Sequence, residues 1–124
     1  MKKYLFIIDD EKDFTFFIKK NLEATGQFDV TICNDATIAV ERARQLRPTA
    51  ILLDIMMPGI GGEDLATQLA AHAETKKIPV IFLTALVKAE ETAGHGNVIG
   101  GHRFVAKPVK IQELIGVINQ VAGP

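Results

Sequence analysis

The amino-acid sequence predicts an α/β fold: an open, doubly wound parallel sheet of five strands with helices on both faces. Five short apolar runs occur along the chain, and longer segments separate them. Runs that are apolar on both faces are typical of strands in a buried parallel sheet. Most of the longer segments have apolar residues at helical spacing, so strand and helix alternate. Helical crossovers between parallel strands are right-handed and cover both faces of the sheet, which gives this architecture.

The five predicted strands are short, and each is followed by polar or turn-forming residues. In an open α/β sheet the functional site lies at the carboxyl ends of the strands, near a topological switch point. The residues that follow each strand are therefore the first place to look for chemistry. In chain order the predicted strands are Tyr4 to Ile8, Phe28 to Ile32, Ala50 to Leu53, Val80 to Leu83 and Arg103 to Ala106.

The first two intervening segments are predicted to be amphipathic helices. The first is followed by Gly26, a plausible C-terminal stop. The second has Asn34 or Asp35 as its N-cap and Pro48 just beyond its end. The inward-facing residues are Phe14, Phe17, Ile18 and Leu22 in the first helix, and Ala36, Ala39, Val40, Ala43 and Leu46 in the second.

Two further helices are predicted, at about Glu63 to His72 and about Ile111 to Val121. The connection from Leu86 to His102 has a weaker pattern, because four glycines crowd its second half. Each glycine inside a helix costs about 1 kcal/mol relative to alanine. We therefore expect only a short or frayed helix in this connection.

Length and composition indicate one globular domain over residues 1–124, with no separate effector domain. The chain has 124 residues, of which 48% are hydrophobic and 23% charged, enough to bury a core. The formal net charge of −1 provides no basic field for direct nucleic-acid binding. No apolar stretch approaches the length of a membrane span or a secretion signal, and Cys33 is the single cysteine. A reducing cytoplasm is therefore the expected location.

Polar residues follow four of the predicted strands. Asp9 and Asp10 follow the first, Asp54 the third, Thr84 the fourth and Lys107 the fifth. Three carboxylates at one edge repel one another unless cations neutralise them. A hard divalent cation takes oxygen ligands, and a lysine adds a point charge. The cluster therefore predicts a metal site that also handles an anion.

Each of these residues has an ordinary structural explanation when taken alone. A single Asp at a strand end is more often a helix cap or a solvated loop residue than a ligand. Thr84 alone would be a strand-end threonine, and Lys107 a solvated charge. Their joint occurrence at matching strand ends is what favours a functional site.

The same residues form a pattern that resembles the receiver domain of two-component response regulators. The matching segments are Ile7 to Glu11, Leu52 to Pro58 with Gly62 after it, Thr84-Ala85 and Lys107-Pro108. The resemblance covers the whole chain, and the set is far more specific than any single piece. It implies a flavodoxin-like sheet with strand order 2-1-3-4-5, in a protein similar to the stand-alone chemotaxis regulators.

The resemblance also implies a role for each residue of the site. Asp54 would accept a phosphoryl group, with Mg²⁺ (or Mn²⁺) as cofactor. Asp10 would be a direct metal ligand and Asp9 would act through water, while Asp54 and the main-chain carbonyl of Met56 complete the protein's share of the shell. Thr84 would hydrogen-bond a phosphoryl oxygen, and Lys107 would pair with the phosphoryl group through a cis Lys107–Pro108 bond.

A sensor histidine kinase or a histidine phosphotransfer protein would donate the phosphoryl group, and an unknown protein would be the downstream target. Phe104 stands where the family typically has an aromatic switch residue that moves together with the residue matching Thr84; a core Phe is an equally good interpretation. Such a domain catalyses its own phosphorylation and slow dephosphorylation and is not a turnover enzyme. Two departures stand out, Gly61 in place of a common Asp and the glycine-rich stretch from Gly94 to His102.

Three other functions are possible for an α/β domain with these residues. A phosphohydrolase with an Asp nucleophile usually has a second acid two residues later, where this chain has Met56, and carries a cap domain. A flavin carrier needs a phosphate-binding loop where this chain has acidic residues. The main alternative is a receiver-like protein-binding module that works without phosphorylation, although the retained Asp10, Asp54, Thr84 and Lys107 argue against it.

Overall fold

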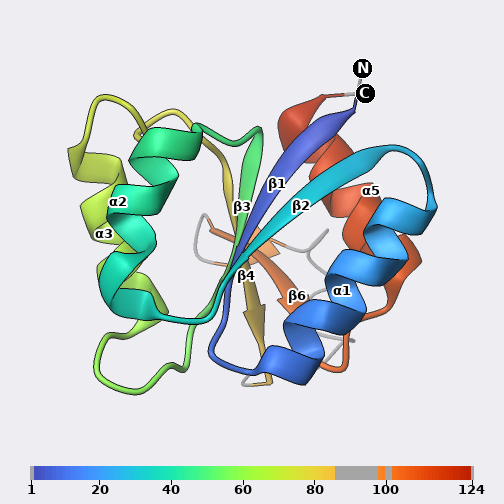
Figure 1. Cartoon of the computed structure of the whole chain (residues 1–124), viewed down its shortest axis with the longest axis horizontal. Coiled ribbons are helices and arrows are strands. Elements are labelled where there is room, and N and C mark those ends of the chain that lie inside the picture. The colour runs from blue at the N-terminus through green and yellow to red at the C-terminus, as the bar shows by residue number, and fades with distance from the viewer. Residues whose placement is uncertain (1, 86–97, 100–101, 124) are drawn as a thin grey trace.

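The computed structural model describes residues 2–85, 98–99 and 102–123, and Figure 1 shows how their strands and helices are arranged. The strands of this part of the chain form one sheet with the order β2-β1-β3-β4-β6-β5. The pairs β1–β2, β1–β3, β3–β4 and β4–β6 are parallel, which confirms the predicted five-stranded α/β sheet. The elements are β1 (Lys3–Ile8), α1 (Lys12–Ala24), β2 (Phe28–Cys33), α2 (Ala36–Leu46), β3 (Ala50–Asp54), α3 (Gly62–Ala71), β4 (Val80–Thr84), β5 (Val98–Ile99), β6 (His102–Ala106) and α5 (Ile111–Ala122).

Helices cover both faces of the sheet. In β1, Leu5 and Ile7 pack into the core under α1 and α5, whereas Phe6 and Ile8 pack into the core under α2 and α3. Figure 1 shows α1 and α5 on one side of the strands and α2 and α3 on the other. Because successive strand residues point to opposite faces, a strand with two covered faces must be apolar throughout. No helix in the described ranges is long and apolar enough to cross a bilayer.

The helix ends follow from local chemistry. Gly26 has a positive φ of 76° just after α1, so it acts as the predicted stop. Of the two predicted caps of α2, the structure uses Asp35, whose carboxylate accepts a hydrogen bond from the backbone N–H of Thr37 at 3.0 Å. Arg47 ends α2 in the left-handed region, with a φ of 47°.

One strand was missed by the sequence prediction. Val98 and Ile99 form β5, which pairs antiparallel with β6 through Arg103 and His102. A two-residue strand is too short to show a period, and the neighbouring glycines hide it further. The short or frayed helix predicted in this connection falls in 86–97, outside the described residues.

The register of the sheet brings the predicted site residues to one edge. Ile8 pairs with Leu53, so Asp9 and Asp54 follow side by side. Thr84, the last residue of β4, pairs with Ala106, and Lys107 follows directly. The carboxyl ends of β1, β3, β4 and β6 therefore meet at the same edge.

Candidate functional site

Three polar side chains at this edge are buried. Asp9 is 0% exposed, Asp54 3% and Thr84 1%. A buried carboxylate is stable only when charges or hydrogen bonds compensate it. The surroundings of each group therefore decide what the site can do.

The turn after β1 is held by hydrogen bonds around Asp9. The Asp9 carboxylate accepts a bond from the backbone N–H of Glu11 at 3.0 Å. The Asn34 side chain donates to the carbonyl of Asp9 at 2.7 Å and to the hydroxyl of Thr15 at 3.1 Å. Asn34, which does not cap α2, thus ties this turn to the first helix.

The turn after β3 needs a glycine. A side chain on Gly62 would place its Cβ 2.3 Å from the carbonyl oxygen of Asp54 and 2.7 Å from the Cα of Ile55. The Gly62 N–H donates to the Ile55 carbonyl at 2.8 Å, which closes the turn into α3. The Asp54 carboxylate accepts the Met56 N–H at 3.2 Å. The close approach explains the glycine eight residues after Asp54.

Lys107 lies among three carboxylates. Its ammonium nitrogen is 2.9 Å from Asp9 Oδ2, 3.0 Å from Glu11 Oε1 and 3.6 Å from Asp54 Oδ1. Its backbone N–H donates to the Thr84 carbonyl at 2.9 Å. The Lys107–Pro108 peptide bond is cis, as predicted.

The charges at this edge perturb two pKa values. Burial, and then the charge of Asp9, raise the pKa of Asp54 from 3.8 to about 6, although Lys107 opposes this shift. Burial by itself lowers the pKa of Lys107, but its hydrogen bonds to Asp9 and Glu11 outweigh burial and raise the pKa overall. The edge thus carries more negative charge than one lysine neutralises.

Three carboxylates could share a metal ion. Ligand oxygens of Asp9, Glu11 and Asp54 all lie within 4.8 Å of one another. Hard divalent cations such as Mg²⁺ bind this kind of oxygen cluster, and the surplus negative charge favours one. Glu11 was not among the predicted site residues, although it lies two residues after Asp9 in the acidic segment that carries the resemblance.

Asp10 and Met56 lie at the rim of the site. Asp10 is exposed, and it lines a hollow of about 470 Å³ together with Met56 and Gly61. The charge of Asp10 is among the minor causes that raise the pKa of Asp54. The Met56 side chain is 63% exposed. The metal-binding roles of both residues stay predictions.

Phe104 lies on β6, away from the acidic edge. It stacks on Phe82 with a centroid separation of 5.3 Å and is half-buried against the core under α2 and α3. Both rings border a hollow of about 240 Å³, together with Glu63 and Thr67. The geometry is compatible with both interpretations of this residue, packing and switching.

The family is settled by comparison with known proteins. The model of the response regulator receiver domain matches residues 5–119. The chain belongs to this family. Among curated relatives, the DNA-binding response regulator MtrA of Mycobacterium tuberculosis is 30% identical over 119 residues, covering 96% of this chain and 50% of the relative. The phosphate regulon regulatory protein PhoB of Rhizobium meliloti is 32% identical over 113 residues, covering 91% and 49%. This receiver domain thus spans about half the length of these relatives.

Solved receiver structures agree with the fold. The receiver domain of the sensor histidine kinase PA1611 from Pseudomonas aeruginosa superposes with a TM-score of 0.81 at 26% identity, covering all of both chains. In that protein a magnesium ion is coordinated in the active site cleft. A response regulator from Desulfuromonas acetoxidans gives a TM-score of 0.78 at 31% identity, covering 96% of this chain and 95% of that one. The sheet that carries the acidic edge is thus the sheet of a receiver domain.

Proposed function

We propose that this receiver domain is a phosphoryl-accepting signalling switch, and that Asp54 is the acceptor. The observation that carries the proposal is the setting of Asp54, a carboxylate only 3% exposed at the end of the central strand β3. It has the ammonium group of Lys107 at 3.6 Å. Strand β3 pairs with β1 on one side and β4 on the other, so Asp54 lies between the strand ends that carry Asp9 and Thr84.

The chemistry requires a nucleophile, charge neutralisation and positioning. One Asp54 carboxylate oxygen attacks the phosphorus of a phosphohistidine; the P–O bond forms, the P–N bond breaks and the imidazole nitrogen keeps the electron pair. With a pKa of about 6, Asp54 is mostly ionised at neutral pH, so the attack needs no general base. Lys107 neutralises the transferred oxygens, and the Thr84 hydroxyl donates a hydrogen bond to one of them.

The oxygen cluster fits a Mg²⁺ ion, and Mn²⁺ takes the same donors. Asp10, Asp54 and the main-chain carbonyl of Met56 would hold the ion directly, and Asp9 through water. When bound, the ion supplies positive charge against the oxygens of the phosphoryl group. Asp9 and Asp54 of this shell belong, with Glu11, to the group of carboxylates whose oxygens lie within 4.8 Å of one another. The surplus negative charge that Lys107 leaves there also favours a cation.

Output would pass through a local change that biases a two-state element. Thr84 moves toward the phosphoryl group, and Phe104 fills the space that it leaves, which changes the binding face for a downstream protein. The hollow beside Phe104 and Phe82 gives the ring room to move. The domain modifies itself in this scheme and is not a turnover enzyme.

A sensor histidine kinase or a histidine phosphotransfer protein would be the donor, in the cytoplasm. Curated relatives such as MtrA are DNA-binding response regulators over about twice this length. We propose that residues 1–124 themselves contact protein partners and not nucleic acid, since their net charge is −1. The alternative, a module that works without phosphorylation, is disfavoured by a buried acceptor next to a paired lysine.

The proposal is tested with phosphoramidate, whose P–N bond resembles that of phosphohistidine. Incubation with phosphoramidate and Mg²⁺ should add one phosphoryl group by intact mass, and a chelator should prevent it. A protein that stays unmodified at saturating Mg²⁺ would favour the phosphorylation-independent alternative.

The metal ligands are tested by titration. Asp10→Asn should weaken Mg²⁺ binding about tenfold, because one anionic ligand is lost. Asp13→Asn removes the same charge from an exposed position three residues away and should leave the affinity nearly unchanged. Equal affinities for the Asp10 and Asp13 variants would remove Asp10 from the metal shell.

A further inference from the structure

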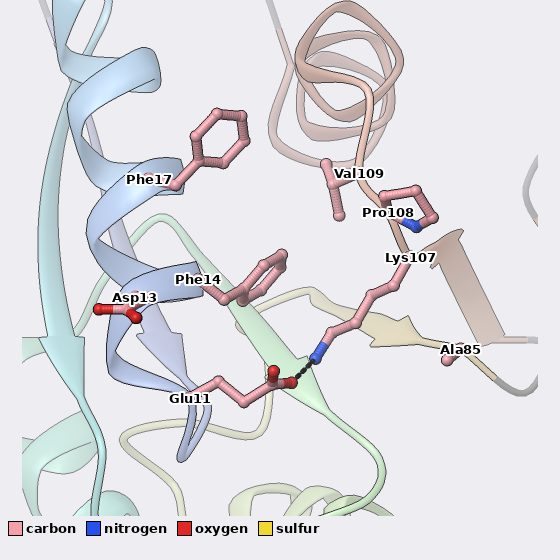
Figure 2. Close-up of a pocket in the computed structure, with 8 residues that line it drawn as sticks. All are labelled: Glu11, Asp13, Phe14, Phe17, Ala85, Lys107, Pro108 and Val109. Carbon is pink, nitrogen blue, oxygen red and sulfur yellow. Dashed lines mark hydrogen bonds and ion pairs between the residues drawn. The ribbon is translucent and has the colours of Figure 1, made fainter.

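The ammonium group of Lys107 has two partners that the proposed chemistry does not use. One is Glu11, whose carboxylate accepts a hydrogen bond from Lys107 at 3.0 Å. The other is Phe14, whose ring centroid lies 4.4 Å from the ammonium nitrogen. Figure 2 shows the Lys107 side chain reaching from the β6–α5 connection toward Glu11, with the Phe14 ring beside it. Both partners come from the start of α1.

The resting bonds of Lys107 favour these groups over Asp54. An ammonium group has three donors. Two of them make short bonds, to Asp9 at 2.9 Å and to Glu11 at 3.0 Å. Asp54 is an ion-pair partner at 3.6 Å, beyond the distance of a good hydrogen bond. These two bonds hold the ammonium nitrogen away from Asp54, so its movement toward a phosphoryl group on Asp54 lengthens at least one of them.

Burial decides which partner can release Lys107. Asp9 has a side chain that is 0% exposed, and an unpaired charge there would be strongly destabilising. The Glu11 side chain is 62% exposed, so water can solvate it once the lysine leaves. The bond to Glu11 is the one that can be broken at small cost.

We infer that Glu11 and Phe14 are positioning residues that hold Lys107 in a resting place, and that a phosphoryl group on Asp54 replaces Glu11 as the partner of the ammonium group. The inference rests on the proposed function, since it assumes that Asp54 carries the phosphoryl group. The Glu11 carboxylate and the phosphoryl group then compete for the ammonium group of Lys107. Glu11 tunes that competition toward the resting state.

Phe14 makes the resting place specific. A cation close to an aromatic face is attracted by the ring quadrupole, more strongly where water is partly excluded. The Lys107 side chain is 14% exposed, so its ammonium group is largely screened from water. Phe14 is half-buried against the core and cannot follow the lysine. Movement of Lys107 toward the phosphoryl group therefore separates it from the ring.

The first test measures binding of a phosphoryl analogue. At saturating Mg²⁺, Glu11→Gln should bind beryllofluoride about two- to fivefold more tightly than the starting protein, because the competing anion is gone. Asp13→Asn is the matched control, because Asp13 lines the same pocket as Glu11 and Lys107. The ion pairs of Lys107 within the described residues are with Asp9, Glu11 and Asp54 and do not include Asp13. Weaker binding by Glu11→Gln, or the same gain in both variants, would overturn the inference.

The second test follows Lys107 directly. Without metal, NMR should find the Cε protons of Lys107 shifted upfield by the Phe14 ring. Phe14→Leu should abolish the shift, while Phe17→Leu, which changes another ring of the same pocket, should keep it. Adding Mg²⁺ and beryllofluoride to the starting protein should reduce the shift, and Glu11→Gln should reduce it beforehand. A shift that beryllofluoride leaves unchanged would show that Lys107 does not leave its resting place.

The two proposals fail in different ways. If the starting protein takes no phosphoryl group and binds no beryllofluoride, the proposed function fails. If it does both but Glu11→Gln behaves like Asp13→Asn, only the inference about Glu11 fails.

Discussion

At the scale of single residues, the carboxylates of the site carry more negative charge than Lys107 neutralises. Asp9 and Asp54 are buried together, and Lys107 bonds closely to Asp9 but not to Asp54. The raised pKa of Asp54 records this imbalance. The same imbalance is what a divalent cation can relieve, so stability and metal binding are coupled.

The raised pKa predicts an unusual pH dependence without metal. Asp54 has a folded-state pKa of about 6 against an ordinary value of 3.8, so its contribution to stability is present below pH 3.8 and is lost as pH rises through 6. The gap corresponds to about 3 kcal/mol at most. In a chelator, the unfolding free energy of the starting protein relative to Asp54→Asn should therefore fall by up to about 3 kcal/mol between pH 4 and pH 7.5.

The comparison with Asp54→Asn cancels the titration of other groups. Asp35 and Glu74, for example, have lowered pKa values because they accept hydrogen bonds from Thr37 and Arg44. Their contribution to stability therefore grows as pH rises, and it does so equally in the starting protein and in Asp54→Asn. Mg²⁺ should make the difference in unfolding free energy between the two proteins less dependent on pH, because it neutralises the site. If this difference does not depend on pH in the chelator either, the pKa of Asp54 is not raised by its surroundings.

The polar site residues at the strand ends could be predicted from the sequence, but the contacts of Lys107 with Glu11 and Phe14 could not. Asp9, Asp54, Thr84 and Lys107 were identified because polar residues follow apolar strands. The bonds of Glu11 and Phe14 to Lys107 depend on how the first turn of α1 faces the β6–α5 connection. That orientation is a tertiary feature, and no spacing along the chain encodes it.

At the scale of elements, the turn from β3 into α3 positions Asp54, the proposed acceptor. The backbone of Gly62 contacts the carbonyl of Asp54, so any side chain there must displace the end of β3. Gly61, next to it, is the N-cap of α3 in an extended conformation, and a Cβ there would have nothing closer than 3.9 Å. Two adjacent glycines therefore have very different roles.

Gly62→Ala should destabilise the domain by about 1–3 kcal/mol and slow phosphorylation, because the overpacked turn shifts Asp54. Gly61→Ala is the control and should cost less than about 1 kcal/mol, the loss of a tolerable cap residue. Chemical denaturation of both variants measures the difference. Equal stabilities would show that the turn has more freedom than the contact indicates.

The end of α2 carries a strained residue. Arg47 has a φ of 47°, the left-handed conformation that glycine adopts at least cost. Arg47→Gly should stabilise the domain by about 1 kcal/mol. Arg47→Ala keeps the strain while removing the side chain, so it should give no gain. A gain of equal size in both variants would assign the effect to the arginine side chain and not to the backbone.

At the scale of the whole molecule, the sheet could be predicted because its two covered faces make the strands apolar throughout. The order of those strands came from resemblance, since apolar pattern alone does not say which strands are neighbours. Strand β5 could not be predicted, because two residues beside glycines carry no period. Asp10 and Met56 lie at an exposed rim of the site, where packing does not fix their side chains, and their metal-binding roles stay predictions.

If Asp54 alone accepts the phosphoryl group, mapping of the modified residue should find the modification only there. After phosphorylation with an acyl phosphate and Mg²⁺, borohydride reduces an aspartyl phosphate to homoserine, which peptide mass spectrometry can locate. We expect homoserine at position 54 only, and no label in Asp54→Asn. Homoserine at position 9 or 10, or persistent labelling of Asp54→Asn, would contradict it.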